Sequence, residues 1–188
     1  MRSLSRVPVS RRSPRWRHQA QWRRGQLPVP LRGWLLDEGS LTDRLRQSCP
    51  GGFRVVVVEE GWRRPQPDEA RLLGLTPDAR AWVRQVRLLC RGRAWVFART
   101  VVPASTFSGP CRRLRHLGSR PLGAWLFARR DLARSPMQLA CIQPGSTLHR
   151  DAMGSSGQRD ALWGRRSVFR VAGRPLLVSE IFLPGLAR

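Results

Sequence analysis

Glu180 is an acidic residue inside an apolar segment, Leu176 to Leu183, of a chain whose formal net charge is +23. Alternate side chains of an extended strand point to the same face, so Glu180 would share a face with Val178 and Phe182. Burial of an ionised carboxylate is costly unless a partner offsets it. That partner could be an arginine, a ligand hydroxyl or a proton that the carboxyl group retains. The alternative is an edge strand with Glu180 in water, and this segment alone leaves both open.

Two further positions could hold an anion near such a carboxylate. Arg84 alternates with apolar residues in the β-rich run 82–90, so strand geometry gives it the same inward direction as Glu180. Leu41 follows the first residue of a capping sequence, 40–43, where free backbone N–H groups attract anions, although most helix starts bind only water or their own cap. The three positions suit a small anionic substrate that carries a hydroxyl. No Ser-His-Asp order, phosphate-binding loop, dinucleotide fingerprint or metal motif accompanies them in the sequence.

The predicted elements form a scaffold that could bring these positions together. Runs rich in β-branched and aromatic residues predict strands at 53–60, 82–90, 94–102, 137–140, 163–171 and 175–183. The polar tripeptides 91–93 and 172–174 predict two hairpins, and helices are expected from residues 31 and 41 and over 124–128. The sequence therefore predicts an α+β single domain, with an antiparallel sheet of about six strands, a few helices packed on it and a buried ligand site. Residues 104–120 are expected to be a connection, and residues 143–159 a surface loop.

Length and composition limit the number of domains. A chain of 188 residues with 41% hydrophobic content suits one domain with its own core. The first 33 residues contain nine arginines and no acidic residue, so we expect residues 1–30 to be a basic, disordered N-terminal extension and residues 31–188 to be the folded domain. The beginning of the chain also resembles an organellar transit peptide in composition. Deletion of residues 1–25 should leave turnover intact.

The positive charge is a weak guide to function. All 35 basic residues are arginine, and the chain has no lysine, asparagine or tyrosine, a pattern typical of a GC-rich genome. A nucleic-acid binder is one hypothesis that the charge supports. However, the sequence shows no zinc-ligand spacing, RNA-binding aromatic strand, heptad repeat or clear helix-turn-helix. We therefore expect no specific nucleic-acid partner.

The four cysteines, Cys49, Cys90, Cys111 and Cys141, form no CxxC pair and have no short spacing to a histidine. Their spacing predicts neither a metal cluster nor a disulfide scaffold, and each is expected to be a small buried hydrophobic residue. No stretch approaches the roughly 18 apolar residues of a membrane span, and the N-terminus lacks the apolar segment of a secretory signal. We expect a cytoplasmic protein that does not insert into membranes.

Six short segments are more specific than the composition. They are WLLDEGSLT (34–42), WVRQVRLLC (82–90), ARTVVPAST (98–106), RPLGAWLF (120–127), LWGRRS (162–167) and LLVSEIFLP (176–184). Together, and in this order, they closely resemble the chorismate pyruvate-lyase family and cover most of the chain. The segments ARTVVP and LWGRRS are the most specific.

The resemblance implies an enzyme that converts chorismate to 4-hydroxybenzoate and pyruvate, the first committed step toward ubiquinone in many bacteria, without a metal or organic cofactor. It implies that Arg84 pairs with the ring carboxylate, which the main chain at Leu41 also contacts. Glu180 would meet the ring hydroxyl, and Leu122 would add a contact to the bound ring. Arg84 and Glu180 are thus the expected catalytic residues. Leu41 replaces a methionine found in the family, but a main-chain contact should survive that change.

The resemblance leaves several roles open. Glu180 could act as a base or only orient the hydroxyl, and the ring proton could leave through the protein or pass directly to the departing enolpyruvyl carbon. The enolpyruvyl carboxylate needs its own cation, for which Arg99, Arg165 and Arg166 are candidates, although a structural ion pair would also explain each of them. The family releases its product slowly from behind mobile segments, which implies product inhibition. Residues 104–127 would suit such a cover, and the long loop before LWGRRS could alter release.

The alternative function is a non-catalytic small-ligand-binding module, because the effector domains of some transcription regulators share the fold that the resemblance implies. Such domains normally follow a winged-helix domain, and the residues ahead of the predicted fold are too few for one. We expect a monomer whose partner is the small molecule chorismate. Production of 4-hydroxybenzoate from chorismate would distinguish the enzyme from the binding module.

Overall fold

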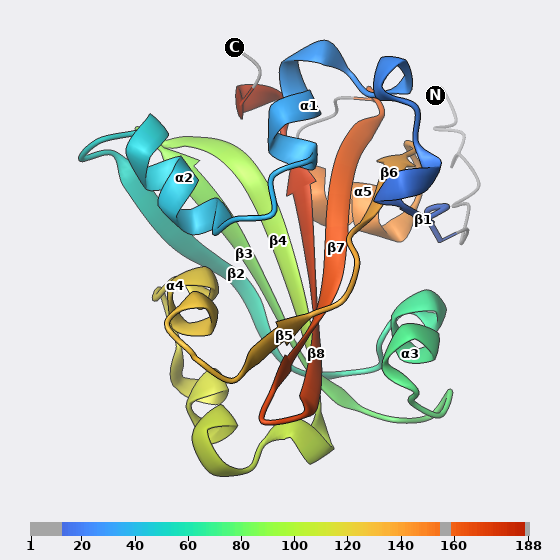
Figure 1. The fold of residues 1–188 in the computed structure, drawn as a ribbon, viewed down its shortest axis with the longest axis vertical. Helices are drawn as coiled ribbons and strands as arrows, with labels where there is room; N and C mark the ends of the chain where they lie inside the picture. Colours follow the sequence, from blue (N-terminus) through green and yellow to red (C-terminus); the bar gives the residue numbers. More distant parts are fainter. Residues whose placement is uncertain (1–12, 155–158, 187–188) are drawn as a thin grey trace, which may run out of the picture.

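One antiparallel sheet forms the centre of the molecule (Figure 1). The computed structural model describes residues 13–154 and 159–186. The strand order is β1-β6-β7-β8-β4-β3-β2, and β5 pairs with β7 outside this path. The strands are β1 (Arg17–His18), β2 (Phe53–Arg63), β3 (Ala81–Cys90), β4 (Arg93–Pro103), β5 (Leu132–Arg134), β6 (Gln138–Ile142), β7 (Leu162–Val171) and β8 (Arg174–Phe182). The α+β prediction is confirmed, and the sheet has eight strands within the described residues because the short β1 and β5 join it.

Helices cover both faces of the sheet. They are α1 (Val29–Leu35), α2 (Leu41–Ser48), α3 (Pro67–Leu73), α4 (Leu122–Phe127) and α5 (Thr147–Met153). The first, second and fourth pack on one face, here called the α2–α4 face, and the other two pack on the opposite face, the α3–α5 face. Figure 1 shows α2 and α4 on one side of the strands and α3 on the other.

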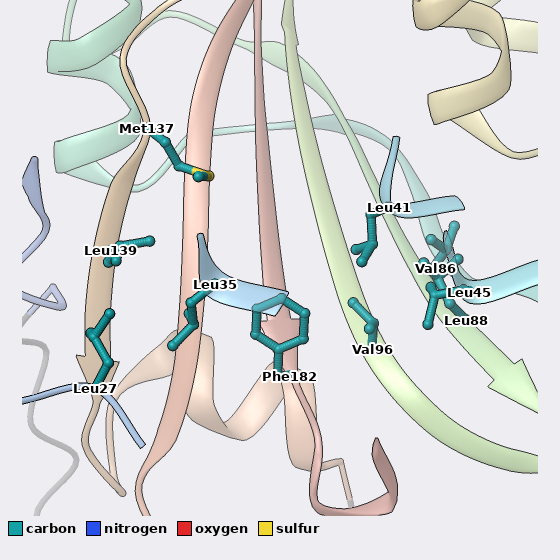
Figure 2. Packing of buried hydrophobic residues seen from close by; sticks show 10 residues of the cluster. All are labelled: Leu27, Leu35, Leu41, Leu45, Val86, Leu88, Val96, Met137, Leu139 and Phe182. Atoms are coloured by element: carbon teal, nitrogen blue, oxygen red, sulfur yellow. The ribbon is translucent and has the colours of Figure 1, made fainter. Parts of the chain in front are cut away.

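Alternate side chains of the strands supply a core to each face. On the α2–α4 face, Leu35 and Leu41 pack with Val96 and Phe182 in a buried cluster, which Figure 2 shows extending across the strands as far as Leu139. On the α3–α5 face, a separate cluster joins α5 to β4 and β8. Each fully buried aliphatic or aromatic side chain contributes about 1.5–3 kcal/mol to stability. A charged strand residue that points into either layer must therefore find a partner there.

Both predicted hairpins are confirmed. The β3–β4 turn contains Arg91 and Gly92 with φ angles of 47° and 79°, and the β7–β8 turn contains Ala172 and Gly173 with φ angles of 50° and 75°. Two-residue turns with positive φ at both positions match the twist of antiparallel strands, and glycine adopts such angles without steric cost. These turns set the registers of the four central strands.

The helix start predicted near Leu41 is also confirmed. The Ser40 side chain accepts a hydrogen bond from the Asp43 backbone N–H over 3.3 Å, as an N-cap residue does. Leu41 and Leu45 are buried one turn apart against the sheet. The cap and the apolar spacing together place the first turn of α2 on the α2–α4 face.

The helices on the α3–α5 face differ from the prediction. The expected surface loop 143–159 contains α5, whose N-cap Ser146 accepts a hydrogen bond from the His149 N–H over 3.2 Å. Residues 155–158 of that loop lie outside the described residues. The helix α3 begins at Pro67, where the sequence indicated only a loop. Both helices are too short to be stable in isolation, so packing on the sheet decides their structure.

The N-terminal segment packs on the fold, contrary to expectation. Within it, β1 pairs with β6, the rings of Trp22 and Trp163 meet edge to face at 5.2 Å, and Leu27 is only 3% exposed. The prediction that residues 1–30 form a disordered extension is therefore wrong from residue 13 onward, because scattered apolar anchors outweigh the basic composition. Deletion of residues 1–25 would remove β1 and the Trp22 contact, so we expect it to lower stability.

One cysteine pair also corrects the sequence prediction. Cys49, directly after α2, and Cys90, the last residue of β3, form a disulfide with Cα atoms 5.9 Å apart. Their separation of 41 residues carries no local signal, so only the fold reveals the pair. Cys111 is a buried free cysteine, as predicted, and Cys141 is a half-buried one.

Candidate functional site

A cavity lies on the α2–α4 face, between α2, α4 and the strands β3, β4 and β8. Leu41, Arg84, Leu122 and Glu180 all line it. These four residues come from four different elements, α2, β3, α4 and β8. The structure thus brings these four predicted residues together in one cavity.

The cavity wall is mainly apolar. Its apolar lining includes Val55, Val86, Leu88, Ala98, Leu126, Phe169 and Val178. Among the described residues that line it, only Arg84 and Glu180 carry charge. An apolar cavity with a few polar groups is typical of a small-molecule site, in which the polar groups fix the orientation of the ligand.

Gly123 allows the N-terminal ends of α2 and α4 to meet at this cavity. A Cβ atom at Gly123 would lie only 2.7 Å from Thr42 Oγ1, which is too close for packed atoms. The glycine therefore permits an approach that places Leu41 and Leu122 in the same wall. The first turn of α2 presents its backbone N–H groups at this end, where a negative charge is stabilised.

Arg84 is a buried arginine that is only partly hydrogen-bonded by protein groups. It is 3% exposed, and its Nη2 donates to the backbone carbonyls of Gly118 and Arg120 over 2.7 and 3.2 Å. Its Nε lies 3.7 Å from Glu60 Oε2, and both atoms are buried without a hydrogen-bond partner among the described residues. Burial lowers the pKa of Arg84, and the charge of Glu60 only partly offsets this effect. A buried guanidinium with unused N–H groups is suited to bind an anion.

Glu180 has a permanent partner at the other end of the cavity. Its Oε2 accepts a hydrogen bond from Arg165 Nε over 2.6 Å, and its side chain is 19% exposed. Among the described residues, no group donates to Oε1. Of the partners considered from sequence, the structure therefore contains the arginine, and one oxygen still faces the cavity side for a ligand hydroxyl.

Arg165 links Glu180 to the segment between α1 and α2. Its side chain is 1% exposed, and its Nη1 donates to the backbone carbonyls of Trp34, over 2.8 Å, and Asp37. These contacts fix the guanidinium group, which in turn fixes the Glu180 carboxylate. Arg165 is thus a positioning residue for Glu180 rather than a free cation.

Two of the three arginines considered for a second carboxylate lie on the opposite face. Arg99 Nε and Nη2 donate to the two carboxylate oxygens of Glu69 over 2.7 and 3.1 Å. Arg166 donates to Asp68 over 2.5 Å and to Gln138 over 2.8 Å. Both belong to the α3–α5 face, because neighbours along a strand point in opposite directions. The structure does not bring either of them to the cavity.

Arg134, at the end of β5, is a residue near the cavity that the sequence analysis missed. Its Nε donates to Ser167 Oγ over 3.1 Å and its Nη1 to the Glu38 carbonyl over 2.7 Å. Its guanidinium carbon lies 5.1 Å from the centre of the Phe169 ring, which lines the cavity. No local sequence signal marks this arginine, because it lies on a three-residue strand among many other arginines.

The registers set the spacing between the two charged groups of the cavity. Arg84 pairs with Thr100 across β3 and β4, and Glu180 pairs with Ala98 across β4 and β8. The two side chains therefore stand on either side of β4, on strands roughly 10 Å apart, which is twice the spacing of neighbouring strands. A small ring with an anionic group at one end and a hydroxyl at the other fits this arrangement. The guanidinium would bind the anion, and the carboxylate would accept from the hydroxyl.

Comparison with known families gives a consistent result. The sequence model of the family described as chorismate lyase matches residues 15–187. A protein of Methylococcus capsulatus named probable chorismate pyruvate-lyase is 46% identical over 83% of this chain and 96% of its own length. A protein of the same name from Halorhodospira halophila is 41% identical over 90% of this chain and 93% of its own length.

Solved structures support the fold alone. PhnF from Mycobacterium smegmatis is 15% identical with a TM-score of 0.54, over 79% of this chain and 65% of that one. The C-terminal domain of the histidine utilization repressor from Pseudomonas syringae is 12% identical with a TM-score of 0.54, over 72% of this chain and 94% of that one. No helix within the described segments is both long and apolar enough to cross a membrane.

Proposed function

This chain belongs to the chorismate lyase family, and from that membership we infer that it is a chorismate pyruvate-lyase, which forms 4-hydroxybenzoate and pyruvate. The observation that carries the inference is the single cavity into which four separate elements bring Leu41, Arg84, Leu122 and Glu180. Its two charged groups match the ring carboxylate and the ring hydroxyl of chorismate. The likeness to regulator domains shows a shared fold and gives no reason to prefer a non-catalytic role.

The reaction makes few chemical demands on the protein. The ether bond between the ring and the enolpyruvyl group breaks, and the hydrogen on the hydroxyl-bearing ring carbon leaves as a proton. The ring becomes aromatic, and the released enolpyruvate becomes pyruvate by taking up a proton at its methylene carbon. Atoms and electrons balance without water or an oxidant. The protein therefore needs to position the substrate, exclude water and stabilise the charge that moves to the leaving oxygen.

In this proposal Arg84 holds the ring carboxylate. Its unused N–H groups would form charge-assisted hydrogen bonds with it, and the backbone at Leu41 would add one from the start of α2. A leucine at position 41 is compatible with this contact, because the main chain and not the side chain makes it. Leu122 would pack against the ring from the opposite helix end.

Glu180 would accept a hydrogen bond from the ring hydroxyl through the oxygen that Arg165 leaves free. This orientation determines which ring bond faces the leaving-group side of the cavity. Arg165 would act through Glu180, because its Nε is bonded to that carboxylate and its Nη1 is held by two backbone carbonyls.

The cellular setting is part of the proposal. We place the enzyme in the cytoplasm, at the first committed step toward ubiquinone, with no nucleic-acid partner. We also propose that the protein acts as a monomer. The enclosed apolar cavity would retain 4-hydroxybenzoate, so we propose product inhibition. In a reducing compartment the Cys49–Cys90 pair would be held as thiols.

The deciding experiment incubates the purified chain with chorismate and follows 4-hydroxybenzoate by absorbance. We expect wild type to turn over, and Arg84→Gln to lose about 100-fold in kcat/KM, because it loses charge-assisted hydrogen bonds. Glu180→Gln should lose activity while still binding the ring carboxylate. The matched control is Arg63→Gln, since Arg63 pairs with Glu59 in an exposed ion pair. Folded wild type that forms no product would contradict the lyase function, and full activity of Glu180→Gln would contradict its role.

A further inference from the structure

Chorismate carries a second carboxylate, which the residues assigned so far leave without a cation. This carboxylate ends the enolpyruvyl side chain, and that side chain is attached to the ring carbon next to the one that bears the hydroxyl. Since the proposed function places the hydroxyl at Glu180, the side chain must leave the ring beside Glu180. The inference that follows rests on that proposed function.

The two sides of Glu180 differ in what they offer an anion. On the β4 side, Glu180 pairs with Ala98, which is small and uncharged. On the β7 side it pairs with Arg165, and β5 follows next, where Arg134 pairs with Phe169. Arg165, Phe169 and Glu180 share one face of the sheet, because they are separated by even numbers of residues or directly paired. Positive charge is therefore available only in the β7–β5 direction among the described neighbours of Glu180 on this face.

In this direction Arg134 adjoins the cavity lining without belonging to it. Its guanidinium carbon lies 5.1 Å from the ring centre of Phe169, a cavity-lining residue, and its Nε donates to Ser167 Oγ. Ser167 pairs with Val178, another lining residue. On its other side Arg134 lines an opening beside β5 and β6. The guanidinium thus contacts Phe169 of the cavity lining, while Arg134 itself lines the neighbouring opening.

Arg134 also lacks the carboxylate partner that Arg99, Arg165 and Arg166 have. No carboxylate of the described residues lies within ion-pair distance of it, whereas Arg99, Arg165 and Arg166 each have one. Its Nη2 points to the Met137 sulfur at 3.4 Å, and a thioether is only a weak acceptor. A partly buried cation without a counter-charge is unfavourable unless a ligand supplies the charge.

The charges around Arg134 favour the binding of an anion. Burial lowers the pKa of Arg134, and the positive charge of Arg165 lowers it further. The negative charges of Glu180, Glu38 and Asp37 raise it, but they do not compensate in full. A carboxylate brought beside Arg134 and Arg165 would reduce the repulsion between these two cations.

We propose that Arg134 binds the carboxylate of the enolpyruvyl side chain, beside Phe169 and Ser167. Its Nη2 exchanges the Met137 sulfur for a carboxylate oxygen, while the bonds to Ser167 and the Glu38 carbonyl keep the guanidinium in place. Arg134 then holds the side chain whose ether oxygen accepts the electron pair of the broken bond. It contacts the substrate and the departing pyruvate but not 4-hydroxybenzoate, so it distinguishes substrate from retained product.

The test compares two ligands that differ by one ether-linked carboxymethyl group, which carries this carboxylate. One is 4-hydroxybenzoate, and the other is 3-carboxymethoxy-4-hydroxybenzoate, a stable aromatic mimic that carries an ether-linked carboxylate at the enolpyruvyl position. Calorimetric Kd values are measured for wild type, Arg134→Gln, Arg134→Lys and Arg84→Gln, together with kcat/KM for chorismate. Arg63→Gln is the surface control, and thermal unfolding verifies that each variant is folded.

Arg134→Gln is expected to weaken the binding of the mimic and to lower kcat/KM for chorismate, each by about 10- to 100-fold, because a charge-assisted hydrogen bond is lost. The Kd of 4-hydroxybenzoate should change less than twofold. Arg134→Lys should recover part of the lost affinity for the mimic, and Arg84→Gln should weaken the binding of both ligands. Equal weakening of both ligands by Arg134→Gln, or unchanged affinity for the mimic, would overturn the proposal. If Arg134→Gln does not fold, the same comparison is made with Arg134→Lys. Failure of the lyase function itself would appear separately, as wild type that forms no product.

Discussion

Arg84 and Arg99 lie on neighbouring strands, yet their side chains leave the sheet on opposite faces. Arg99 donates to both carboxylate oxygens of Glu69, and although burial lowers its pKa, the hydrogen bonds and charge of Glu69 outweigh burial and raise it. Arg84 has only two backbone carbonyls and a carboxylate at 3.7 Å, and its pKa is lowered. Two arginines of similar burial therefore have pKa values that are shifted in opposite directions.

The difference separates structural from functional arginines in a chain that has 35 of them. On the α3–α5 face, Arg99 and Arg166 each have a carboxylate partner at hydrogen-bond distance. On the α2–α4 face, Arg84 and Arg134 lack one; Arg84 lines the cavity, and Arg134 contacts Phe169 of its lining. These are the two arginines to which we propose that a ligand supplies negative charge.

The strongest test of this comparison replaces one arginine on each face and measures both the free energy of unfolding and the turnover of chorismate. Arg99→Met removes one partner of a buried ion pair, so it should lower the free energy of unfolding by about 3–5 kcal/mol. Turnover per folded molecule should change less than twofold. Arg84→Gln should show the reverse, with about 100-fold lower kcat/KM and a smaller loss of stability. Urea unfolding and chorismate turnover measure the two quantities.

The matched control is the double variant Arg99→Met with Glu69→Leu, which removes both charges and should recover much of the lost stability. A loss of turnover in folded Arg99→Met as large as that in Arg84→Gln would remove the distinction between the faces.

Removal of the disulfide tests how much this link contributes to the stability of the α2–α4 face. Cys49–Cys90 joins the end of α2 to the end of β3 and closes a loop with a sequence separation of 41 residues. Reduction should lower the free energy of unfolding by about 2–4 kcal/mol, because the unfolded chain gains freedom. The Cys49→Ser, Cys90→Ser variant should match reduced wild type. Thiol titration of denatured protein that was first oxidised in air should give two free thiols, since Cys111 and Cys141 are free, and four after reduction. Four free thiols in the oxidised sample would contradict the link.

Gly123→Ala tests the meeting of the two helix ends at the cavity. The added Cβ would lie 2.7 Å from Thr42 Oγ1, so α4 must shift away from α2. We expect a loss of about 1–3 kcal/mol in stability from overpacking, together with weaker binding of 4-hydroxybenzoate. Combining Gly123→Ala with Thr42→Ala, which removes Oγ1 itself, serves as a partial rescue. Unchanged product affinity in Gly123→Ala would show that this contact does not shape the site.

The smallest expected effects concern pH, and they should have opposite signs on the two faces. Burial raises the pKa of Asp151, which lies near Arg99, and the charge of Arg99 offsets this only in part. Burial also raises the pKa of Asp37 on the cavity side, but hydrogen bonds from the Gly39 N–H and Arg44, with the charges of nearby arginines, outweigh burial and lower it.

The signs follow from proton binding. Asp151 holds its proton more tightly in the folded state, so it destabilises the fold as pH rises from 3.8 through its raised pKa. Asp151→Asn should therefore be more stable than wild type at neutral pH, with the gain lost on acidification. Asp37 contributes stability above 3.8 that disappears as pH falls through its lowered pKa, so Asp37→Asn should be less stable at neutral pH. Urea unfolding over a pH series measures both differences, and equal signs would contradict the assignment.

Much of the site could be predicted because its signals are local. Strand alternation places Glu180 with Val178 and Arg84 with Val86, and all four line the cavity. The capping residue Ser40 marks the start of α2. By contrast, α3 and α5 were missed because short helices owe their stability to tertiary packing, and the basic composition of the N-terminus concealed its apolar anchors.

Sequence alone predicts that Arg84 and Glu180 share strand faces with apolar residues and that the chain resembles one family, because residue alternation and segment order are properties of the linear chain. Only the tertiary structure decides which arginines form ion pairs with a carboxylate. Arg165 and Arg166 are neighbours in one motif, yet one holds Glu180 and the other pairs with Asp68 across the sheet. Pairing depends on strand register and on partners far away in sequence, and the energy of a buried charge depends on that pairing. For this reason Arg134 becomes a candidate substrate-binding residue only when the three-dimensional structure shows the Met137 sulfur, and no carboxylate of the described residues, beside its Nη2.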